Sequence, residues 1–187
     1  QFGEDDSEAL ASDLLHLGMA SVSTVIGGLG GSAIVQIVHT QVTAAQTVSL
    51  ATGGTFYDIP SMNATITPTS ATNQVLVMPM IHYGTQAGGY IPYIRIMRDA
   101  IVIATGNAAG SRTLASSGQY DPNGDLTWLS SYSWIDSPAT TSATTYKLQA
   151  SSPTSSNTFY HNRGNTDGNS TGHMRGASSI ILMEVTA

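Results

Sequence analysis

The sequence predicts an all-β protein: an antiparallel β-sandwich of jelly-roll type, preceded by a short N-terminal helix. Two observations support this prediction. About ten short runs of residues alternate between apolar and polar side chains or are apolar throughout, and turn-forming residues separate them, as in a sandwich or jelly roll. Charged residues make up only 10 % of the chain, against about 25 % in an average soluble domain, so Ser, Thr, Gly and Asn must cover much of the surface.

The composition also limits the possible functions. At 187 residues the chain is long enough for one domain and a small appendage. A net charge of −6, without a cluster of Lys or Arg, argues against nucleic-acid binding. Because Cys is absent, we expect no disulfide framework, and because no run of about 18 apolar residues occurs, we expect no membrane insertion. The chain begins at Gln1, so we expect that a leader has been removed or that this is a fragment.

Residues 1–31 differ from the rest of the chain. Acidic residues gather at the start, and leucines behind them recur at nearly helical spacing, which predicts a short helix over about residues 7–19. The Gly-rich stretch 27–31 is expected to be a hinge before a β module of residues 32–187. The apolar stripe either packs on the chain's own β module or anchors it to another subunit or a host particle. The stripe consists of Leu10, Leu14, Leu15 and Leu17.

Within the β module, each expected strand ends at a turn signal. Residues 73–83 and 178–185 are nearly continuous apolar runs, typical of strands buried on both faces, and 178–185 is expected to be central. Pro79 has no amide hydrogen for a ladder, so it implies a bulge or an edge position. In chain order, the expected strands are residues 34–43, 46–51, 56–60, 64–67, 73–83, 90–98, 100–105, 126–135, 144–149, 158–161 and 178–185, with a polar segment at 111–117.

The stretch 126–149 holds both tryptophans and sets the pattern for the whole module. Its first strand places Trp128, Tyr132 and Trp134 on one face and ends at Asp136-Ser137-Pro138, after which a second strand follows. These aromatic rings either fill the sandwich core or a subunit interface, or stack on sugar rings. Filling an interior is the more common use of such residues.

No pattern in the chain identifies a catalytic or metal site. His161 and His173 share a loop region with Asp167, but solvated loop histidines explain them better than a metal does. The run 121–125 begins like a calcium loop, then departs from it in the positions of its glycine and its final acid, which favours a plain turn. No pair of carboxylates has a context typical of glycoside cleavage. We therefore expect no enzyme activity, no cofactor and no metal.

Three polar loops, 84–89, 118–125 and 151–175, are the candidate binding surface, because receptor contacts tend to lie on loops that a rigid scaffold holds. Their amide, hydroxyl and guanidinium groups can hydrogen-bond to sugar hydroxyls, and tyrosines can supply a stacking face. The alternative is that the loops are merely solvated or contact a neighbouring subunit. The candidate receptor-binding residues are Tyr120, Tyr160, His161, Asn162 and Arg163.

Four segments resemble a family of small bacteriophage virion proteins, usually described as tail-fibre or structural proteins: GNAAGSRTLASSG at 106–118, IDSPATTSATTYKLQ at 135–149, NRGNTDGNSTGHMR at 162–175 and ASSIILMEV at 177–185. The resemblance covers about residues 34–187 and implies a virion location and a β-rich module, with no catalytic residues.

A Ser/Thr/Tyr surface with few charges has a lower desolvation cost on burial between subunits than a charged surface, so we expect a homotrimer. With the resemblance, this predicts a trimeric tail-fibre or tail-tip module that attaches to a host-surface polysaccharide and joins other virion proteins through residues 1–31. The alternative is a capsid decoration or head-fibre protein with a purely structural role.

Overall fold

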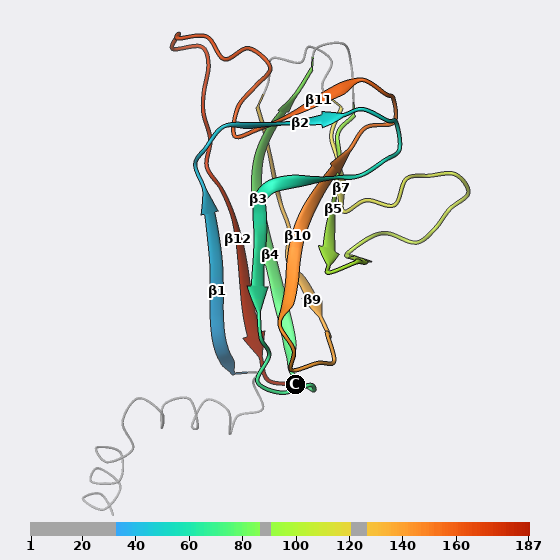
Figure 1. The fold of residues 1–187 in the computed structure, drawn as a ribbon, viewed down its shortest axis with the longest axis vertical. Helices are drawn as coiled ribbons and strands as arrows, with labels where there is room; N and C mark the ends of the chain where they lie inside the picture. The colour runs from blue at the N-terminus through green and yellow to red at the C-terminus, as the bar shows by residue number, and fades with distance from the viewer. Residues whose placement is uncertain (1–32, 87–90, 121–126) are drawn as a thin grey trace, which may run out of the picture.

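The computed structural model describes residues 33–86, 91–120 and 127–187, whose strands form two antiparallel sheets that face each other (Figure 1). One sheet has seven strands and the other has five. The seven-stranded sheet contains β1 (Ile34–Val42), β2 (Gln46–Leu50), β4 (Gln74–Thr85), β8 (Trp128–Ser131), β9 (Trp134–Asp136), β11 (Asn157–His161) and β12 (Ser178–Val185). The five-stranded sheet contains β3 (Tyr57–Ile66), β5 (Tyr93–Arg98), β6 (Ile101–Ile103), β7 (Ser117–Gly118) and β10 (Thr144–Ser151).

Several of the seven strands lie end to end, so the larger sheet is four strand positions wide. At Met80 and at Tyr83, β8 pairs with one side of β4, while β12 and then β11 pair with the other side. Beyond them, β1 pairs with β12 and β2 pairs with β11. Thus β1 and β2 act as one long bent strand, β11 and β12 as another, and β8 with β9 forms the opposite edge. The smaller sheet has the order β3–β10–β5, with β6 and β7 both paired to β5.

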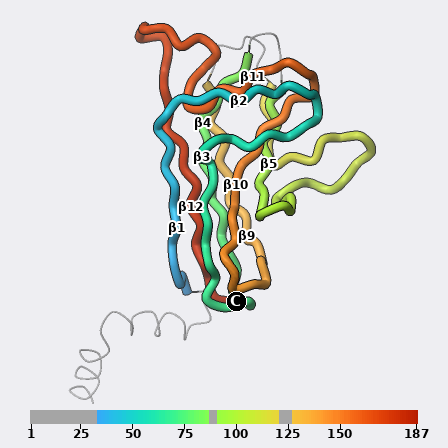
Figure 2. The backbone as a smooth tube through the Cα atoms, in the orientation of Figure 1, coloured from blue at the N-terminus to red at the C-terminus, as the bar shows by residue number. Residues whose placement is uncertain are grey.

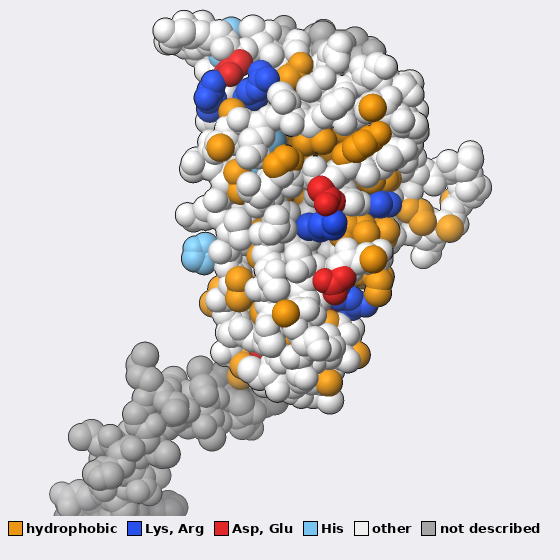
Figure 3. All heavy atoms as spheres, in the orientation of Figure 1, with side chains coloured by type: hydrophobic (Ala, Val, Ile, Leu, Met, Phe, Trp, Pro, Cys, Tyr) orange, Lys and Arg blue, Asp and Glu red, His pale blue; other side chains and the backbone are white. Residues whose placement is uncertain are grey.

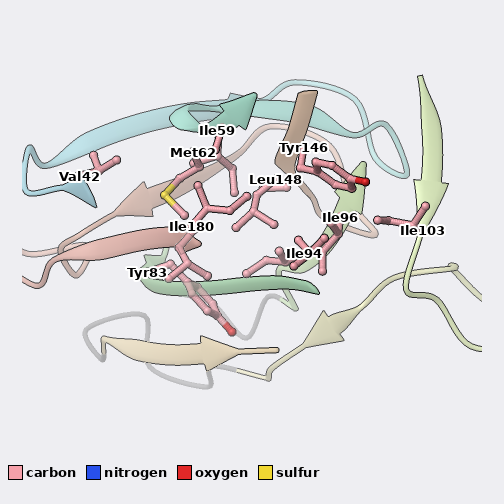
Figure 4. Packing of buried hydrophobic residues seen from close by; sticks show 14 of the residues in the cluster. Val42, Ile59, Met62, Tyr83, Ile94, Ile96, Ile103, Tyr146, Leu148 and Ile180 are labelled. Atoms are coloured by element: carbon pink, nitrogen blue, oxygen red, sulfur yellow. The ribbon is translucent and has the colours of Figure 1, made fainter. Parts of the chain in front are cut away.

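The core lies between the two sheets, where alternate residues of each strand point inward (Figure 4). On β12, Ile180 and Leu182 are fully buried while the residues between them are partly exposed. Tyr83 and Phe159 stack at one end of the core, with ring centroids 5.2 Å apart. Strand β12 lies between β1 and β4, which confirms that 178–185 is central.

Buried polar side chains form hydrogen-bond networks that hold the strands together at two places. Arg98 of the five-stranded sheet donates through Nη1 to both carboxylate oxygens of Asp136, at 2.9 and 2.8 Å, and the Tyr146 hydroxyl donates to Asp136 Oδ2 at 2.7 Å. Because Asp136 belongs to the seven-stranded sheet, these bonds join the two layers. Burial, followed by the bond to Asp136, raises the pKa of Tyr146 above its ordinary range. The second network is centred on Glu184, buried on β12 and hydrogen-bonded to β1 and to the connection between β3 and β4.

Pro60 and Pro79 both lie inside strands, although the sequence predicted that Pro60 ends a strand and that Pro79 lies at an edge or a bulge. Residues 56–60 and 64–67 were expected as separate strands, but β3 runs from Tyr57 to Ile66 through Pro60. It can do so because β3 is an edge strand with an irregularity at this point, where Ser61 has φ of 63°. Pro79 lies within a central strand instead of at an edge or a bulge. There the neighbouring edge strand is interrupted, since β8 ends at Ser131 and β9 begins at Trp134.

Residues 111–117, which the sequence marks only as a polar segment, contain no strand before Ser117 and belong to a connection that projects from the smaller sheet. The expected helix 7–19, its leucine stripe and the hinge 27–31 lie outside the described ranges, as do Tyr90 and the turn at 121–125. In the part of the chain that is described, no helix is long and apolar enough to cross a membrane.

Candidate interaction surfaces

The outer face of the seven-stranded sheet is apolar across its full width, and we call it the apolar face. Its cross-strand rows follow from the pairing: Ile37 lies opposite Met183, Met183 opposite Leu76, and Leu76 opposite Ile135. Because residues directly opposite each other in an antiparallel pair point to the same side, these four side chains form one row. The apolar residues of this face are Ile34 and Ile37 of β1, Leu76, Met78 and Met80 of β4, Leu129 of β8, Ile135 of β9, and Ile181, Met183 and Val185 of β12.

This face carries no Asp, Glu, Lys or Arg side chain on β1, β4, β8, β9 or β12. The two acidic residues of these strands, Asp136 and Glu184, are both buried and point to the interior. The polar residues on the face include Gln41, Ser179 and Ser131, which lie in one row with Met80, and two histidines, His39 opposite Ile181 and His82 opposite Leu129. In a sheet with one face in water, the inward side chains of each strand are normally apolar and the outward ones polar. In this sheet the outward side chains are largely apolar as well.

The outer face of the five-stranded sheet, in contrast, is polar and charged. Lys147 forms an ion pair with Asp58 at 2.8 Å, and Gln149 donates to the same carboxylate at 2.6 Å. Arg95 donates to Gln149 at 2.8 Å and lies 3.9 Å from the centroid of the Phe56 ring. Figure 3 views this side of the molecule and shows acidic and basic side chains next to each other. The hydrogen bond from Lys147, ahead of the opposing effect of burial, lowers the pKa of Asp58.

The size of the apolar face is that of an interaction site. The exposed fractions of its side chains reach 57 % for Ile34, 55 % for Ile37, 54 % for Leu129 and 46 % for Ile135. Together such side chains leave on the order of several hundred Å² of contiguous apolar surface in water, the range at which a patch on a monomer marks a binding surface. Strands β4 and β12 are therefore buried on one face only, whereas the sequence predicted burial on both faces.

A second candidate surface is the connection 162–177 between β11 and β12, together with the side chains beside it. An isolated bridge between Arg163 and Arg175 closes the connection. Arg175 donates to both carboxylate oxygens of Asp167, at 3.0 and 2.5 Å. This bond is the main cause that lowers the pKa of Asp167 and raises that of Arg175. The guanidinium of Arg163 lies 4.4 Å from the centroid of the Tyr160 ring, so these two predicted contact residues form one platform. Tyr120 is 56 % exposed but belongs to a different connection, the one between β7 and β8.

Two of the predicted receptor-binding residues, His161 and Asn162, are fully buried, so the expectation that they are exposed is wrong. His161 points inward from β11, as Phe159 does, and its Nδ1 lies 3.3 Å from Gln46 Oε1. Its Nε2 has no hydrogen-bond partner, and burial lowers its pKa from 6.5 to about 4. The alternation Asn157, Phe159, His161 was the signal available in the sequence for this burial.

Asn162 joins the two bent strands. Its side-chain amide donates to the carbonyl oxygens of Val42 at 2.8 Å and Ala44 at 3.1 Å, where β1 turns into β2. Its side-chain carbonyl accepts from the Ser178 hydroxyl at 2.6 Å, where β12 begins. Its φ of 60° lies in the left-handed region, which Asn tolerates better than most residues. Asn162 is therefore part of the scaffold that holds the 162–177 connection.

Only some of the aromatic residues in the stretch 126–149 pack against the core. Trp128 and Tyr132 are partly buried and pack against the core, whereas Trp134 at the sheet edge is 43 % exposed. Tyr83, near the end of β4, is fully buried. Within residues 33–86, 91–120 and 127–187, no group of three or more His, Cys, Asp or Glu side chains lies in an arrangement that can hold a metal ion.

No protein-family model matches the chain, and no curated protein does. Among solved structures, that of the infectious bursal disease virus Gt strain is similar with a TM-score of 0.41 and 15 % identity, over 83 % of this chain and 39 % of that one. The crystal structure of the infectious bursal disease virus VP2 subviral particle is similar with a TM-score of 0.38 and 11 % identity, over 82 % of this chain and 40 % of that one. The chain thus spans about two fifths of the length of these neighbours. The fold described above rests on its own strand pairing.

Proposed function

We propose that this protein is a structural subunit of a bacteriophage particle that assembles with copies of itself. The observation that supports this proposal is the difference between its two outer sheet faces. The outer face of the five-stranded sheet carries the ion pair of Lys147 with Asp58, whereas the described outer face of the seven-stranded sheet carries no ion pair and leaves apolar side chains exposed. A subunit that is permanently covered on one side by a neighbour has this distribution.

The strand order supports a jelly roll as the fold of this subunit. Jelly rolls contain eight strands in two sheets, built from two Greek keys. Here each sheet is four positions wide: β1/β2, β11/β12, β4 and β8/β9 in one, and β3, β10, β5 and β6/β7 in the other. Strands that follow each other in the chain, such as β2 and β3 or β4 and β5, lie in different sheets, as the roll requires.

For the particle, we propose a homotrimeric tail-fibre or tail-tip module, which residues 1–31 anchor to other virion proteins and whose free loops attach to a host-surface polysaccharide. The Arg163–Tyr160 platform supports the attachment role, because a guanidinium stacked on a ring combines hydrogen-bond donors with an apolar plane. Tyr120 is the second exposed aromatic residue proposed to contact the sugar.

Self-assembly is tested by placing charge on the apolar face. Purified protein should show a mass of about three times the 19.5 kDa chain in light scattering, as a closed trimer requires. The double variant Ile37→Lys with Ile135→Lys should fall to the mass of one chain, because buried lysines without partners are costly. Thr65→Lys, on the exposed outer face of the five-stranded sheet, is the matched control and should keep the full mass. A wild-type monomer at micromolar concentration contradicts the proposal, and a dimer contradicts the trimer alone.

Attachment is tested with Tyr120, Tyr160 and Arg163 replaced together by Ala. The variant should enter particles normally, while adsorption of those particles to host cells falls at least tenfold. Unchanged adsorption overturns the attachment role and leaves the capsid decoration or head-fibre alternative. Failure to enter particles means that these side chains contact a neighbouring subunit.

A further inference from the structure

The connection between β6 and β7, residues 104–116, projects from the body as an arm (Figures 1 and 2). Residues 106–114 are all exposed. The base of the arm is fastened to the five-stranded sheet, since Ser116 N donates to the Ile94 carbonyl at 2.8 Å and Ile96 N donates to Ser116 Oγ at 3.2 Å. Its tip is a local turn in which both Arg112 N and Arg112 Nη1 donate to the Ala109 carbonyl, at 3.3 and 3.2 Å.

The arm has the composition of a segment that another chain covers. It carries one charged residue, Arg112, among small and neutral polar ones, and the side chain of Leu114 is 41 % exposed. At its root, Ile101 and Val102 of β6 are 54 % and 38 % exposed, so the apolar surface continues from the arm onto the edge of the sheet. Loops longer than about 12 residues with no secondary structure are uncommon unless they serve a function.

The apolar face by itself has about the area of a small subunit contact. Strand β12 has 8 residues, and at about 3.4 Å per residue and about 4.8 Å between four strand positions the face measures on the order of 500 Å² in projection. Specific interfaces bury at least about 500 Å² and typically about 800 Å² of accessible surface from each partner. Among the residues that the structure describes, the arm with Ile101 and Val102 is an exposed surface that projects from the body and can enlarge such a contact.

We propose that the arm of one copy, residues 104–116, lies across the apolar face of the next copy. The two surfaces are different parts of one chain, so the contact is heterologous, and a heterologous contact that closes on itself forms a ring, such as a trimer. Both surfaces are almost free of charge, so little desolvation cost opposes their contact. This inference rests on the proposed self-assembly and adds which surfaces meet.

The absence of cysteine from the chain allows a direct test, because one engineered cysteine is a unique attachment point. Ser111→Cys, at the exposed tip of the arm, is labelled with benzophenone-maleimide, mixed with isotopically heavy wild-type protein and irradiated. Cross-linked peptides identified by mass spectrometry should join residue 111 of the light chain to heavy residues of β1, β4 or β12. Thr65→Cys, labelled in the same way, is the matched control and should give no such peptide.

A second variant replaces residues 107–113 with Gly-Gly. It should keep the β circular-dichroism spectrum and melt cooperatively, because the base of the arm at Ser116 is retained, but its mass should fall to one chain. If wild-type protein is an oligomer while this variant stays oligomeric, or if the cross-links reach only other surfaces or the same chain, the arm contact is wrong and self-assembly stands. If wild-type protein is a monomer, both proposals fail together.

Discussion

Glu184 allows a quantitative test of how much one buried carboxylate stabilises the β-sandwich at the end where the chain enters β1. Its side chain is fully buried. Oε1 accepts from Thr69 N at 2.7 Å, Thr69 Oγ1 at 2.8 Å and Asn73 Nδ2 at 2.6 Å, while Oε2 accepts from Gln36 Nε2 at 2.6 Å. One carboxylate thus joins β12, β1 and the connection between β3 and β4. Burial raises its pKa, but the bonds from Gln36, Asn73 and Thr69 outweigh this and lower it from 4.5 to about 2.

We predict that Glu184→Gln lowers the free energy of unfolding at pH 7 by about 1–2 kcal/mol and that Glu184→Ala lowers it by about 3–5 kcal/mol. The lowering of the Glu184 pKa from 4.5 to about 2 corresponds to at most about 3 kcal/mol of stabilisation. Glutamine keeps an acceptor for Thr69 and Asn73 and loses the charge. Alanine leaves these buried donors without an acceptor, which is why its effect is larger.

Urea denaturation of wild type and both variants between pH 2 and pH 8 measures this effect. The folded pKa of Glu184 lies below the unfolded value, so its stabilising contribution is complete above pH 4.5 and is lost as the pH falls from 4.5 towards 2. The curve of Glu184→Gln should therefore run below that of wild type at pH 7 and converge on it at pH 2. A constant difference at every pH, or Gln and Ala variants of equal stability, refutes the charged network.

Three further changes test other parts of the scaffold. Because burial holds the pKa of His161 at about 4, the stability of the protein should decline as the pH falls from 6.5 to 4, by up to about 3 kcal/mol, and His161→Leu should remove this decline in denaturation curves. Asn162→Ala should cost about 2–4 kcal/mol in urea denaturation, and Asn162→Gly about 1 kcal/mol less, because glycine tolerates the φ of 60°. Equal losses would show that the backbone is unstrained. Deletion of residues 1–31 should leave the β module folded, as circular dichroism measures, and abolish its incorporation into particles.

The sequence predicted most strands of this protein from local patterns. Alternation located β1, β10 and β11, and a continuous apolar run located β12 with its bounds unchanged. The sequence did not predict strand bounds correctly where the pairing with neighbouring strands determines them. Pro60 does not end β3 because that strand lies at an edge, and Pro79 is tolerated in β4 because the strand beside it is interrupted there. Neither neighbour is visible in the residues around the proline.

The candidate surfaces were predicted less completely. Tyr160 and Arg163 were named as contact residues and do lie together, although only the fold shows that one stacks on the other. His161 and Asn162 were named from polarity alone, and the turn from β11 towards β12 buries both. Residues 111–117 were recognised only as polar, and the structure shows that most of the segment belongs to an exposed arm. The polarity and spacing of residues in a sequence do not show whether a polar side chain is buried with a hydrogen-bond partner inside the protein.

By itself, the sequence determined that this chain forms β-strands with few charges and that two of them, β4 and β12, are apolar on both sides, because side-chain alternation is a local property of a strand. Only the tertiary structure decided that these two strands are neighbours, that β1, β8 and β9 extend their outer surface to the sheet edges, and that the charged side chains lie elsewhere. The physical reason is that a face of a sheet is made by residues far apart in the chain: Ile37, Leu76, Ile135 and Met183 meet in one row through hydrogen bonds that connect four separate strands.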